Sequence, residues 1–284
     1  MLSPLNLYLK TSRPPILAGI IAYSLFGAVA AGVQDPLKLA LCLASSLLSA
    51  CAVYSFNCFA DLEEDEVNNP ELPRLARKHA TPLKALIVSS VIGSAAAALA
   101  VSVSTAVVSS LVTLIGFSYS LEFRGFKPKK HAVIKSASIG VGWALVAVVP
   151  FAATNSLGSP ACATTFFFTA TQVFIGATLR DFADVRGDRK AGVKSLPVVL
   201  GVKHTKKVLH AANALSAGGV AAAVAWFSAP HSTLALLAGW AWRHANISLV
   251  KQEGTPSWAL REMNLGAGAA FAAALLAGKV LAGG

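Results

Sequence analysis

Most of the carboxylates in this chain lie in two short stretches of its sequence. The first runs from Asp61 to Glu71 and the second from Asp181 to Asp188, and together they hold nine of the thirteen Asp and Glu residues. Each stretch follows a long apolar segment, where an ionised carboxylate is costly unless a cation, a partner or a water-filled cavity accommodates it. We therefore expect a site that holds metal ions together with a strongly anionic ligand.

The spacing within each stretch places three polar side chains on one face of a helix. Steps of four positions advance by only about 40°, and the second set stays within about 60°. Such carboxylates repel each other unless a cation lies between them, and Mg²⁺ binds one or two carboxylates together with water and phosphate oxygens. Two facing sets could hold two Mg²⁺ ions that bridge one diphosphate. The sets are Asn57, Asp61 and Asp65, and Asp181, Asp184 and Asp188.

A plainer interpretation of these acids is that they are helix ends solvated at a membrane surface. It accounts for Glu63, Glu66 and Glu71, but not for two matched sets of three. The six histidines and four cysteines show no metal-ligand spacing, so we expect no metal site built from them.

The composition is that of a membrane protein. Of 284 residues, 55% are apolar and 13% are charged, with a mean hydropathy of +0.62, whereas soluble domains carry about a quarter charged residues. Runs of roughly 18 or more apolar residues predict transmembrane helices. We predict a single all-α integral-membrane domain over residues 1–284. Its nine predicted spans are 16–33, 38–60, 84–102, 104–121, 132–154, 161–182, 206–228, 231–248 and 259–282.

The basic residues predict the orientation of these spans. Twenty-two of the 24 Lys and Arg residues fall on one side of the predicted helices, and only Lys38 and Lys279 on the other. Cytoplasmic loops are enriched in Lys and Arg. We therefore expect a multi-pass protein of the cell membrane whose N-terminus and acidic stretches are cytoplasmic and whose C-terminus is outside. The same asymmetry accounts for most of the net charge of +11, and without a nucleic-acid-binding motif we expect no nucleic-acid partner.

The two acidic stretches also suggest an internal repeat. Asp61 and Asp181 are 120 residues apart, at the ends of the second and sixth predicted spans, and a polar, basic loop follows each. Four spans per half leave both halves in the same orientation around a shared site. We expect two four-helix halves around a central cavity, plus one additional helix.

At this point the chain resembles the UbiA superfamily of intramembrane prenyltransferases. The resemblance rests on the NxxxDxxxD pattern from Asn57 and on the second acidic set, which is followed by GDRKAGVKSLP over 187–197. Arg13-Pro14 before the first span and Tyr119 at the end of the fourth are also similar to that family. The chain departs from the family's usual pattern at Cys58, where Asp is common, and in the loop 69–74, whose Arg74 we take for the family's later arginine.

The resemblance implies magnesium-dependent transfer of a polyprenyl group from its diphosphate to an acceptor. It implies that the six residues of the two sets coordinate the magnesium–diphosphate. We expect an apolar tunnel for the prenyl chain, and aromatic faces that stabilise the allylic cation, with Tyr54, Phe56, Tyr119 and Phe166 to Phe168 as candidates. Ordinary packing remains the alternative for these aromatic residues, and positive-inside charge for the basic ones. The basic candidates for binding the diphosphate are Arg124, Lys127, Arg189, Lys190 and Lys194, and Arg13, Arg74 and Tyr119 are further substrate-binding candidates.

The sequence leaves alternatives open for the acceptor and for the class of function. Gly187-Asp188, with KSLP further on, looks more like members that alkylate geranylgeranylglyceryl phosphate, in ether-lipid synthesis, or like the homogentisate and chlorophyllide branch. We lean to the glyceryl phosphate, and an aromatic acceptor such as 4-hydroxybenzoate or homogentisate is the alternative. Intramembrane acids also occur in ion-coupled transporters, but here they lie at one interface rather than at mid-membrane. A non-catalytic scaffold would not need two matched acidic sets.

Overall fold

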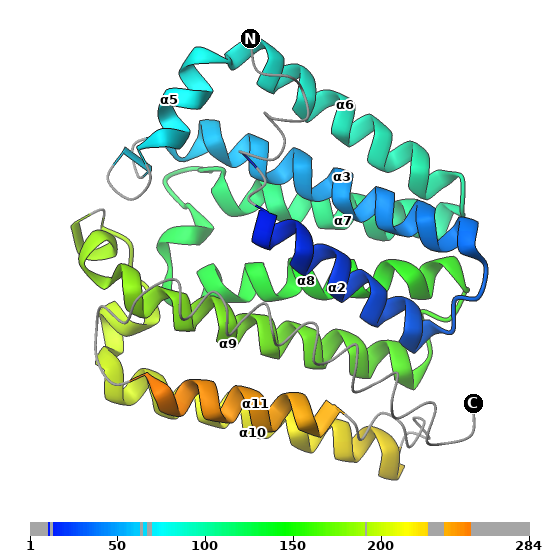
Figure 1. The fold of residues 1–284 in the computed structure, drawn as a ribbon. Coiled ribbons are helices and arrows are strands. Elements are labelled where there is room, and N and C mark those ends of the chain that lie inside the picture. Colours follow the sequence, from blue (N-terminus) through cyan, green and yellow to red (C-terminus); the bar gives the residue numbers. More distant parts are fainter. Residues whose placement is uncertain are drawn as a thin grey trace.

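The protein is a bundle of long helices (Figure 1). The computed structural model describes residues 11, 14–62, 65–66, 70–190, 192–226 and 236–250. An isolated bridge between Phe123 and Phe126 is the one piece of β-structure within these ranges. The elements are α2 (Pro14–Ala31), α3 (Pro36–Ala60), α5 (Glu71–Lys78), α6 (Ala80–Leu99), α7 (Val103–Ser120), the short 3₁₀ helix η1 (Pro128–Lys130), α8 (Ala132–Ala153), α9 (Pro160–Lys190), α10 (Leu196–Trp226) and α11 (Leu236–Leu249).

The expected spans agree with these helices in place and order. Among the described residues, six helices, α3 and α6 to α10, are long and apolar enough to cross a membrane, and the apolar part of α2, Ile16–Ala31, is shorter. Helix α11 matches the eighth expected span. The ninth, 259–282, lies outside the described residues, so the count of nine stays a prediction. The division into two related halves also stays a prediction. In Figure 1, α2 crosses α8, with α3, α6 and α7 on one side of this pair and α9 to α11 on the other.

Two helix boundaries differ from the sequence-based prediction in ways that matter for the acids. Helix α9 continues to Lys190 rather than ending near 182, so the whole second acidic set lies on one helix. Helix α3 ends at Ala60 with Asp61 as its C-cap, so the predicted continuous helix through Asp65 is interrupted. After the cap, the Asp65 N–H donates a hydrogen bond of 2.8 Å to the Asp61 carbonyl.

Local chemistry explains where several helices begin. The Asp35 side chain accepts hydrogen bonds from the N–H groups of Leu37 and Lys38, and Pro36 takes the first helical position of α3. These are the residue types that satisfy the free N–H groups of a helix start and preset its φ angle. Ser102 caps α7 in the same way by accepting from the Thr105 N–H.

Small residues let the helices approach closely around α8. A Cβ atom added to Gly27 of α2 would lie 1.9 Å from the Ala147 carbonyl oxygen of α8, and one added to Gly140 of α8 would lie 2.5 Å from the Ala170 carbonyl oxygen of α9. Such contacts between helix backbones are the usual means of helix association in lipid. They hold α8 between α2 and α9, where its residues can face the acids of both motifs.

Hydroxyl groups join α3, α6 and α7 inside the apolar bundle. Ser49 Oγ lies 2.8 Å from Ser94 Oγ, which lies 3.0 Å from Ser109 Oγ, and Ser45 Oγ is 2.6 Å from Ser109 Oγ. All four side chains are buried. Because hydrocarbon offers no other hydrogen-bond partner, this cluster favours one register of the three helices.

The close contact between α2 and α8 leads to a stability prediction. In Gly27→Ala, the new methyl group meets a backbone carbonyl that cannot rotate away, so the two helices must separate. We expect the free energy of unfolding in detergent to fall by about 1–3 kcal/mol. The matched control is Gly218→Ala on α10, where a Cβ atom meets nothing within 4 Å. Equal unfolding transitions for the two variants would contradict the proposed contact.

Candidate active site at the polar end of the bundle

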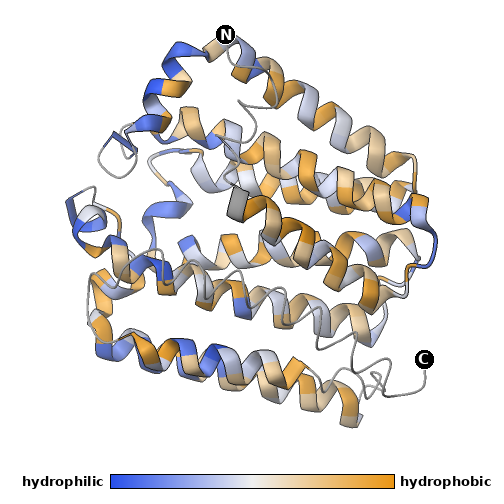
Figure 2. Cartoon of the chain, viewed as in Figure 1, coloured by the Kyte–Doolittle hydropathy of each residue, from blue (hydrophilic) through white to orange (hydrophobic). Residues whose placement is uncertain are grey.

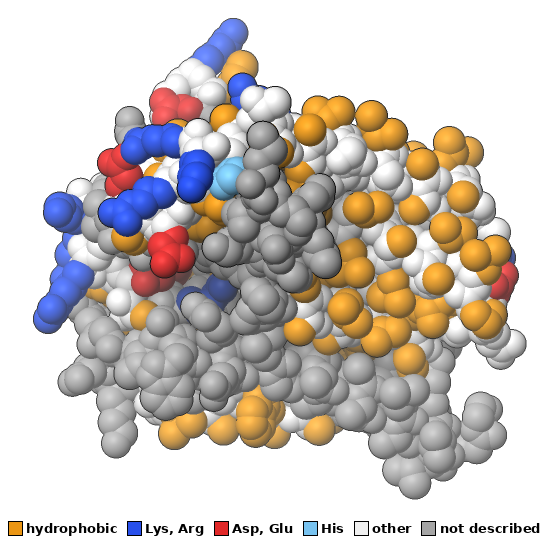
Figure 3. All heavy atoms as spheres, turned by 45° about the horizontal axis from the view of Figure 1, so that its top comes forward, with side chains coloured by type: hydrophobic (Ala, Val, Ile, Leu, Met, Phe, Trp, Pro, Cys, Tyr) orange, Lys and Arg blue, Asp and Glu red, His pale blue; other side chains and the backbone are white. Residues whose placement is uncertain are grey.

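Charged residues gather at one end of the helix bundle. Hydrophilic residues concentrate on α5, on the segment between α7 and α8, and on the last turns of α9, whereas the middles of α2, α3 and α6 to α8 are largely hydrophobic (Figure 2). Figure 3 shows acidic and basic side chains mixed at this end, with hydrophobic side chains over much of the remaining visible face. The two acidic motifs lie here because α3 ends and α9 runs out of its apolar part at the same end.

The first motif places Asp61 beside two lysines. As the C-cap of α3, Asp61 donates its N–H to the Asn57 carbonyl at 3.0 Å. Its Oδ1 lies 2.5 Å from Lys129 Nζ and 3.6 Å from Lys127 Nζ, contacts that are ion pairs without hydrogen-bond geometry. Its Oδ2 accepts a hydrogen bond of 3.4 Å from Ser120 Oγ at the end of α7. One carboxylate is thus held by the segment that enters α8.

In the second motif, one lysine contacts two of the acids. Asp181 and Asp188 are each 5% exposed, and Lys135 Nζ lies 2.8 Å from Asp181 Oδ1 and 3.2 Å from Asp188 Oδ2. Asp184 is exposed. The prediction that the three acids share one face therefore holds for Asp181 and Asp188 in their contact with Lys135. Asp184, one turn along, turns its side chain towards solvent.

All three lysines come from one short segment. Lys127 and Lys129 belong to the loop around η1, and Lys135 to the first turn of α8. The backbone N–H of Lys194, after the second motif, donates to the Lys130 carbonyl at 3.1 Å. The segment 127–135 therefore contacts the first motif at one end and the second at the other, and ties the following loop to itself.

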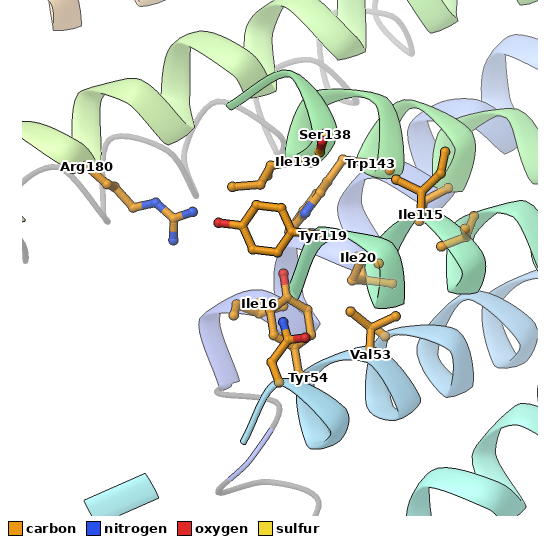
Figure 4. A pocket seen from close by; sticks show the side chains of 16 residues that line it. Ile16, Ile20, Val53, Tyr54, Ile115, Tyr119, Ser138, Ile139, Trp143 and Arg180 are labelled. Atoms are coloured by element: carbon orange, nitrogen blue, oxygen red, sulfur yellow. The ribbon is translucent and has the colours of Figure 1, made fainter. Parts of the chain in front are cut away.

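An apolar cavity of about 190 Å³ begins next to the acids (Figure 4). Asn57, Tyr119 and Arg180 line it near the polar end of the bundle, and Arg180 reaches toward the Tyr119 hydroxyl in this view. Further into the bundle its walls are aliphatic and aromatic. These inner residues come from α2, α3, α7 and α8 and include Ile20, Ala50, Val53, Val112, Ile115, Trp143 and Val146.

The site has oxygen atoms that suit a hard divalent cation. Asn57 Oδ1 and Asp181 Oδ2 are buried and have no hydrogen-bond partner among the described residues. Within the same part of the chain, no group of three His, Cys, Asp or Glu side chains is arranged to hold a metal ion. Mg²⁺ does not need such a group, because it commonly takes one or two carboxylates and completes its shell with water and substrate phosphate. The donor set therefore fits a magnesium–diphosphate in its chemistry.

The predicted basic residues differ in burial. Lys127 is buried against Asp61, whereas the side chains of the other candidates among the described residues are exposed. Arg124 adopts a positive φ of 50°, and its guanidinium lies over the Phe123 ring. Arg13 lies outside the described residues. The exposed candidates are Arg74 on α5, Arg124, Arg189 and Lys190 at the end of α9, and Lys194.

Some of the aromatic candidates line the cavity and others pack elsewhere. Tyr54 and Tyr119 line the cavity, whereas the Phe56 ring packs on Phe117 and Phe168 belongs to the buried core.

Sequence reasoning missed three basic residues that the structure brings to the site. Lys129 and Arg180 were hidden in the general excess of basic residues on this side of the membrane. Lys135 had a signal, because a lysine within an apolar span is costly unless an acid pairs with it. That cost indicated a partner, but the sequence alone did not say which acid it was.

Comparison with known proteins gives a family match and individual relatives. Residues 15–277 match the UbiA prenyltransferase family. A digeranylgeranylglyceryl phosphate synthase from Halobacterium salinarum is 30% identical over 203 residues, which cover 68% of this chain and 68% of the relative. A protein of the same name from Natronomonas pharaonis is 27% identical over 222 residues, or 75% of this chain and 72% of the relative.

A solved structure has the same fold. It is a UbiA homologue from Archaeoglobus fulgidus bound to DMAPP and Mg²⁺, and it matches with a TM-score of 0.69 at 19% identity, over 96% of this chain and 99% of that one. Its likeness supports a helical bundle of this type, and the family match extends over nearly the whole chain. The protein therefore belongs to the UbiA prenyltransferase family, and is a multi-pass intramembrane prenyltransferase.

Proposed function

We propose that the protein transfers a geranylgeranyl group from geranylgeranyl diphosphate to geranylgeranylglyceryl phosphate, in ether-lipid synthesis. The observation that carries this proposal is the apolar cavity that begins at Asn57, Tyr119 and Arg180, beside the acidic motifs. A prenyl diphosphate has the same division, with a hydrocarbon chain at one end and concentrated negative charge at the other. The names of the two haloarchaeal relatives support the choice of the glyceryl phosphate acceptor.

The two motifs are proposed to hold the diphosphate through Mg²⁺, with one ion at each motif. Mg²⁺ would neutralise the diphosphate and assist its departure as a leaving group. Asn57, Asp61 and Asp181 offer the ligands, and Asp188 lies beside Asp181 across Lys135. The A. fulgidus homologue, bound to DMAPP and Mg²⁺, supports this dependence. Asp65 and Asp184 complete the two sets in our proposal.

The chain's own residues would then separate charge during transfer. Lys127, Lys129 and Lys135 orient the carboxylates, and Arg180 at the cavity mouth can bind phosphate oxygens through its planar guanidinium. As the bond between C1 and the diphosphate oxygen breaks, positive charge develops on the allylic group, where the faces of Tyr54 and Tyr119 can stabilise it. The apolar walls exclude water, so the acceptor hydroxyl rather than water attacks C1, and its proton passes to the released diphosphate.

The acceptor phosphate has a proposed binding surface on α5. This helix buries Leu72 and Ala76 and exposes Arg74, Arg77 and Lys78. Arg77 pairs with Glu66 on the chain after the first motif, which connects α5 to the acidic site. A phosphate-bearing acceptor would find cations here, whereas a neutral aromatic acceptor would not need them.

The motif carboxylates give the first functional prediction. Asp61→Ala and Asp181→Ala each remove a proposed metal ligand, and we expect each to lower prenyl transfer by roughly a hundredfold or more. Glu71→Gln, on the exposed start of α5, is the control and should retain activity. Transfer is measured with labelled geranylgeranyl diphosphate at saturating Mg²⁺ in protein that purifies normally. Near-wild-type turnover in either alanine variant would remove that carboxylate from the mechanism.

Removal of the metal gives the second prediction. With excess chelator, the acids and the diphosphate repel each other and only the basic residues attract the ligand, so we expect binding of geranylgeranyl diphosphate to be lost. Calcium should restore binding better than turnover, because its larger and more flexible shell places phosphate oxygens less rigidly than Mg²⁺ does. Calorimetric titration with chelator, Ca²⁺ or Mg²⁺ checks this. Unchanged affinity in chelator would assign binding to the basic residues alone.

The basic face of α5 gives a prediction on acceptor choice. Arg74→Glu should raise the KM for geranylgeranylglyceryl phosphate about tenfold or more, because a phosphate loses a charge-assisted contact. The KM for the prenyl donor should change far less. Lys38→Glu, exposed at the start of α3 at the opposite end of the bundle, is the charge-matched control. A wild-type enzyme that prenylates 4-hydroxybenzoate and ignores the glyceryl phosphate would refute the proposed acceptor.

A further inference from the structure

The inner wall of the cavity contains one large side chain, Trp143 of α8. It lies eight residues beyond Lys135, which corresponds to about 12 Å along the helix from the acidic end. Its indole packs against two groups of buried residues. One is the cavity-lining cluster of Ile20, Ala50, Val112 and Val146, and the other is the core cluster that contains Tyr23, Phe26 and Phe168. Trp143 therefore separates the cavity from the neighbouring core.

The position of the indole is set by α2. A Cβ atom on Gly19 would lie 2.6 Å from Trp143 Cη2 and 2.7 Å from Cζ3, so the ring occupies the space that any other residue would fill. Tyr23, one turn further along α2, meets the indole edge to face, with ring centroids 5.4 Å apart and an interplanar angle of 85°. Gly19 and Tyr23 therefore contact the ring from successive turns of α2, and Trp143 itself lines the cavity.

The cavity is short from its mouth to its inner end. Asn57 at its mouth and Ala50 inside it are seven residues apart on α3, which is about 10 Å. Ile20, Ala50, Val112 and Val146 are buried residues that line its inner part and pack together. A hydrocarbon chain entering from the acidic end therefore meets Trp143 and this cluster within a few isoprene units. Each further unit must displace or pass these side chains.

We propose that Trp143, held by Gly19 and Tyr23, determines which prenyl chain lengths the cavity admits. This inference rests on the proposed function only in taking the cavity as the binding site of the prenyl chain. The ligand class is a linear prenyl diphosphate, and Trp143 acts on its hydrocarbon end rather than on the reacting atoms. It is therefore a specificity residue, whose replacement changes the ranking of donors more than the chemistry.

Two substitutions should shift chain-length preference in opposite directions. Trp143→Leu enlarges the cavity, and Gly19→Ala forces the indole away from α2 and into it. The measured quantity is the ratio of affinities for geranylfarnesyl and geranyl thiolodiphosphate, noncleavable analogues, in the presence of Mg²⁺. We expect Trp143→Leu to raise the preference for the longer analogue about tenfold and Gly19→Ala to lower it about tenfold, the range for small steric changes in an apolar site.

Controls separate this effect from general destabilisation. Gly218→Ala makes the same substitution in a helix with nothing within 4 Å of the new Cβ atom, and should leave the ratio unchanged. If Trp143→Leu does not fold, Trp143→Phe provides a smaller change in the same direction. Equal changes in affinity for both analogues, or shifts of the same sign in Trp143→Leu and Gly19→Ala, would overturn the proposal.

The binding measurement also keeps this inference separate from the proposed acceptor. A wild-type protein that binds the analogues with a chain-length preference but does not prenylate geranylgeranylglyceryl phosphate would refute only that acceptor. A protein whose transfer activity is as proposed, but whose ratio is unaffected by both substitutions, would refute only the role of Trp143.

Discussion

Carboxylates at the edge of a hydrocarbon layer need a positive partner, and much of this site follows from that need. Asp61, Asp181 and Asp188 are held at the polar end of an apolar bundle, where an unpaired charge would be strongly unfavourable. The partners are Lys127, Lys129 and Lys135, all from the segment 127–135 that leads into the first turn of α8. One piece of chain thereby fixes both acidic motifs relative to each other.

That arrangement depends on the central position of α8. Close backbone contacts at Gly27 and Gly140 hold α8 between α2 and α9. With the helix in this place, its first turn presents Lys135 to the second motif, while Trp143 lines the cavity further along the same helix. The polar and apolar parts of the site are thus spaced by the rise of a single helix.

The site as a whole divides a substrate by polarity. In the proposed function, negative charge on a diphosphate is favoured beside the lysines, Arg180 and the Mg²⁺ that the acids would hold, and a hydrocarbon chain is favoured between the apolar walls. The bond that breaks in prenyl transfer lies between these two parts of the substrate. Tyr54 and Tyr119 line the same cavity as Asn57 and Arg180, so aromatic faces are available where positive charge would develop.

The amino-acid sequence by itself determined the helices and the acids. Long apolar runs predict spans without reference to the rest of the chain, and eight of the nine expected segments coincide with helices, the ninth lying outside the described residues. The residue spacings around Asn57 and Asp181 indicated the two motifs, because the spacing of neighbouring residues on one helix does not depend on the rest of the fold. The exposure of Asp184 and the interruption of α3 at Asp61 already depended on how the helix ends pack.

Tertiary structure alone decided which charges meet. The pairing of Lys129 with Asp61 and of Lys135 with Asp181 joins residues 68 and 46 positions apart, and no local period encodes such a distance. Arg74, Arg124 and Lys190 have the same charge as these lysines but are exposed, because their backbone positions face outwards. The sequence therefore determined which chemical groups are present, and the packing of α2 and α9 against α8 decided which of them form the site.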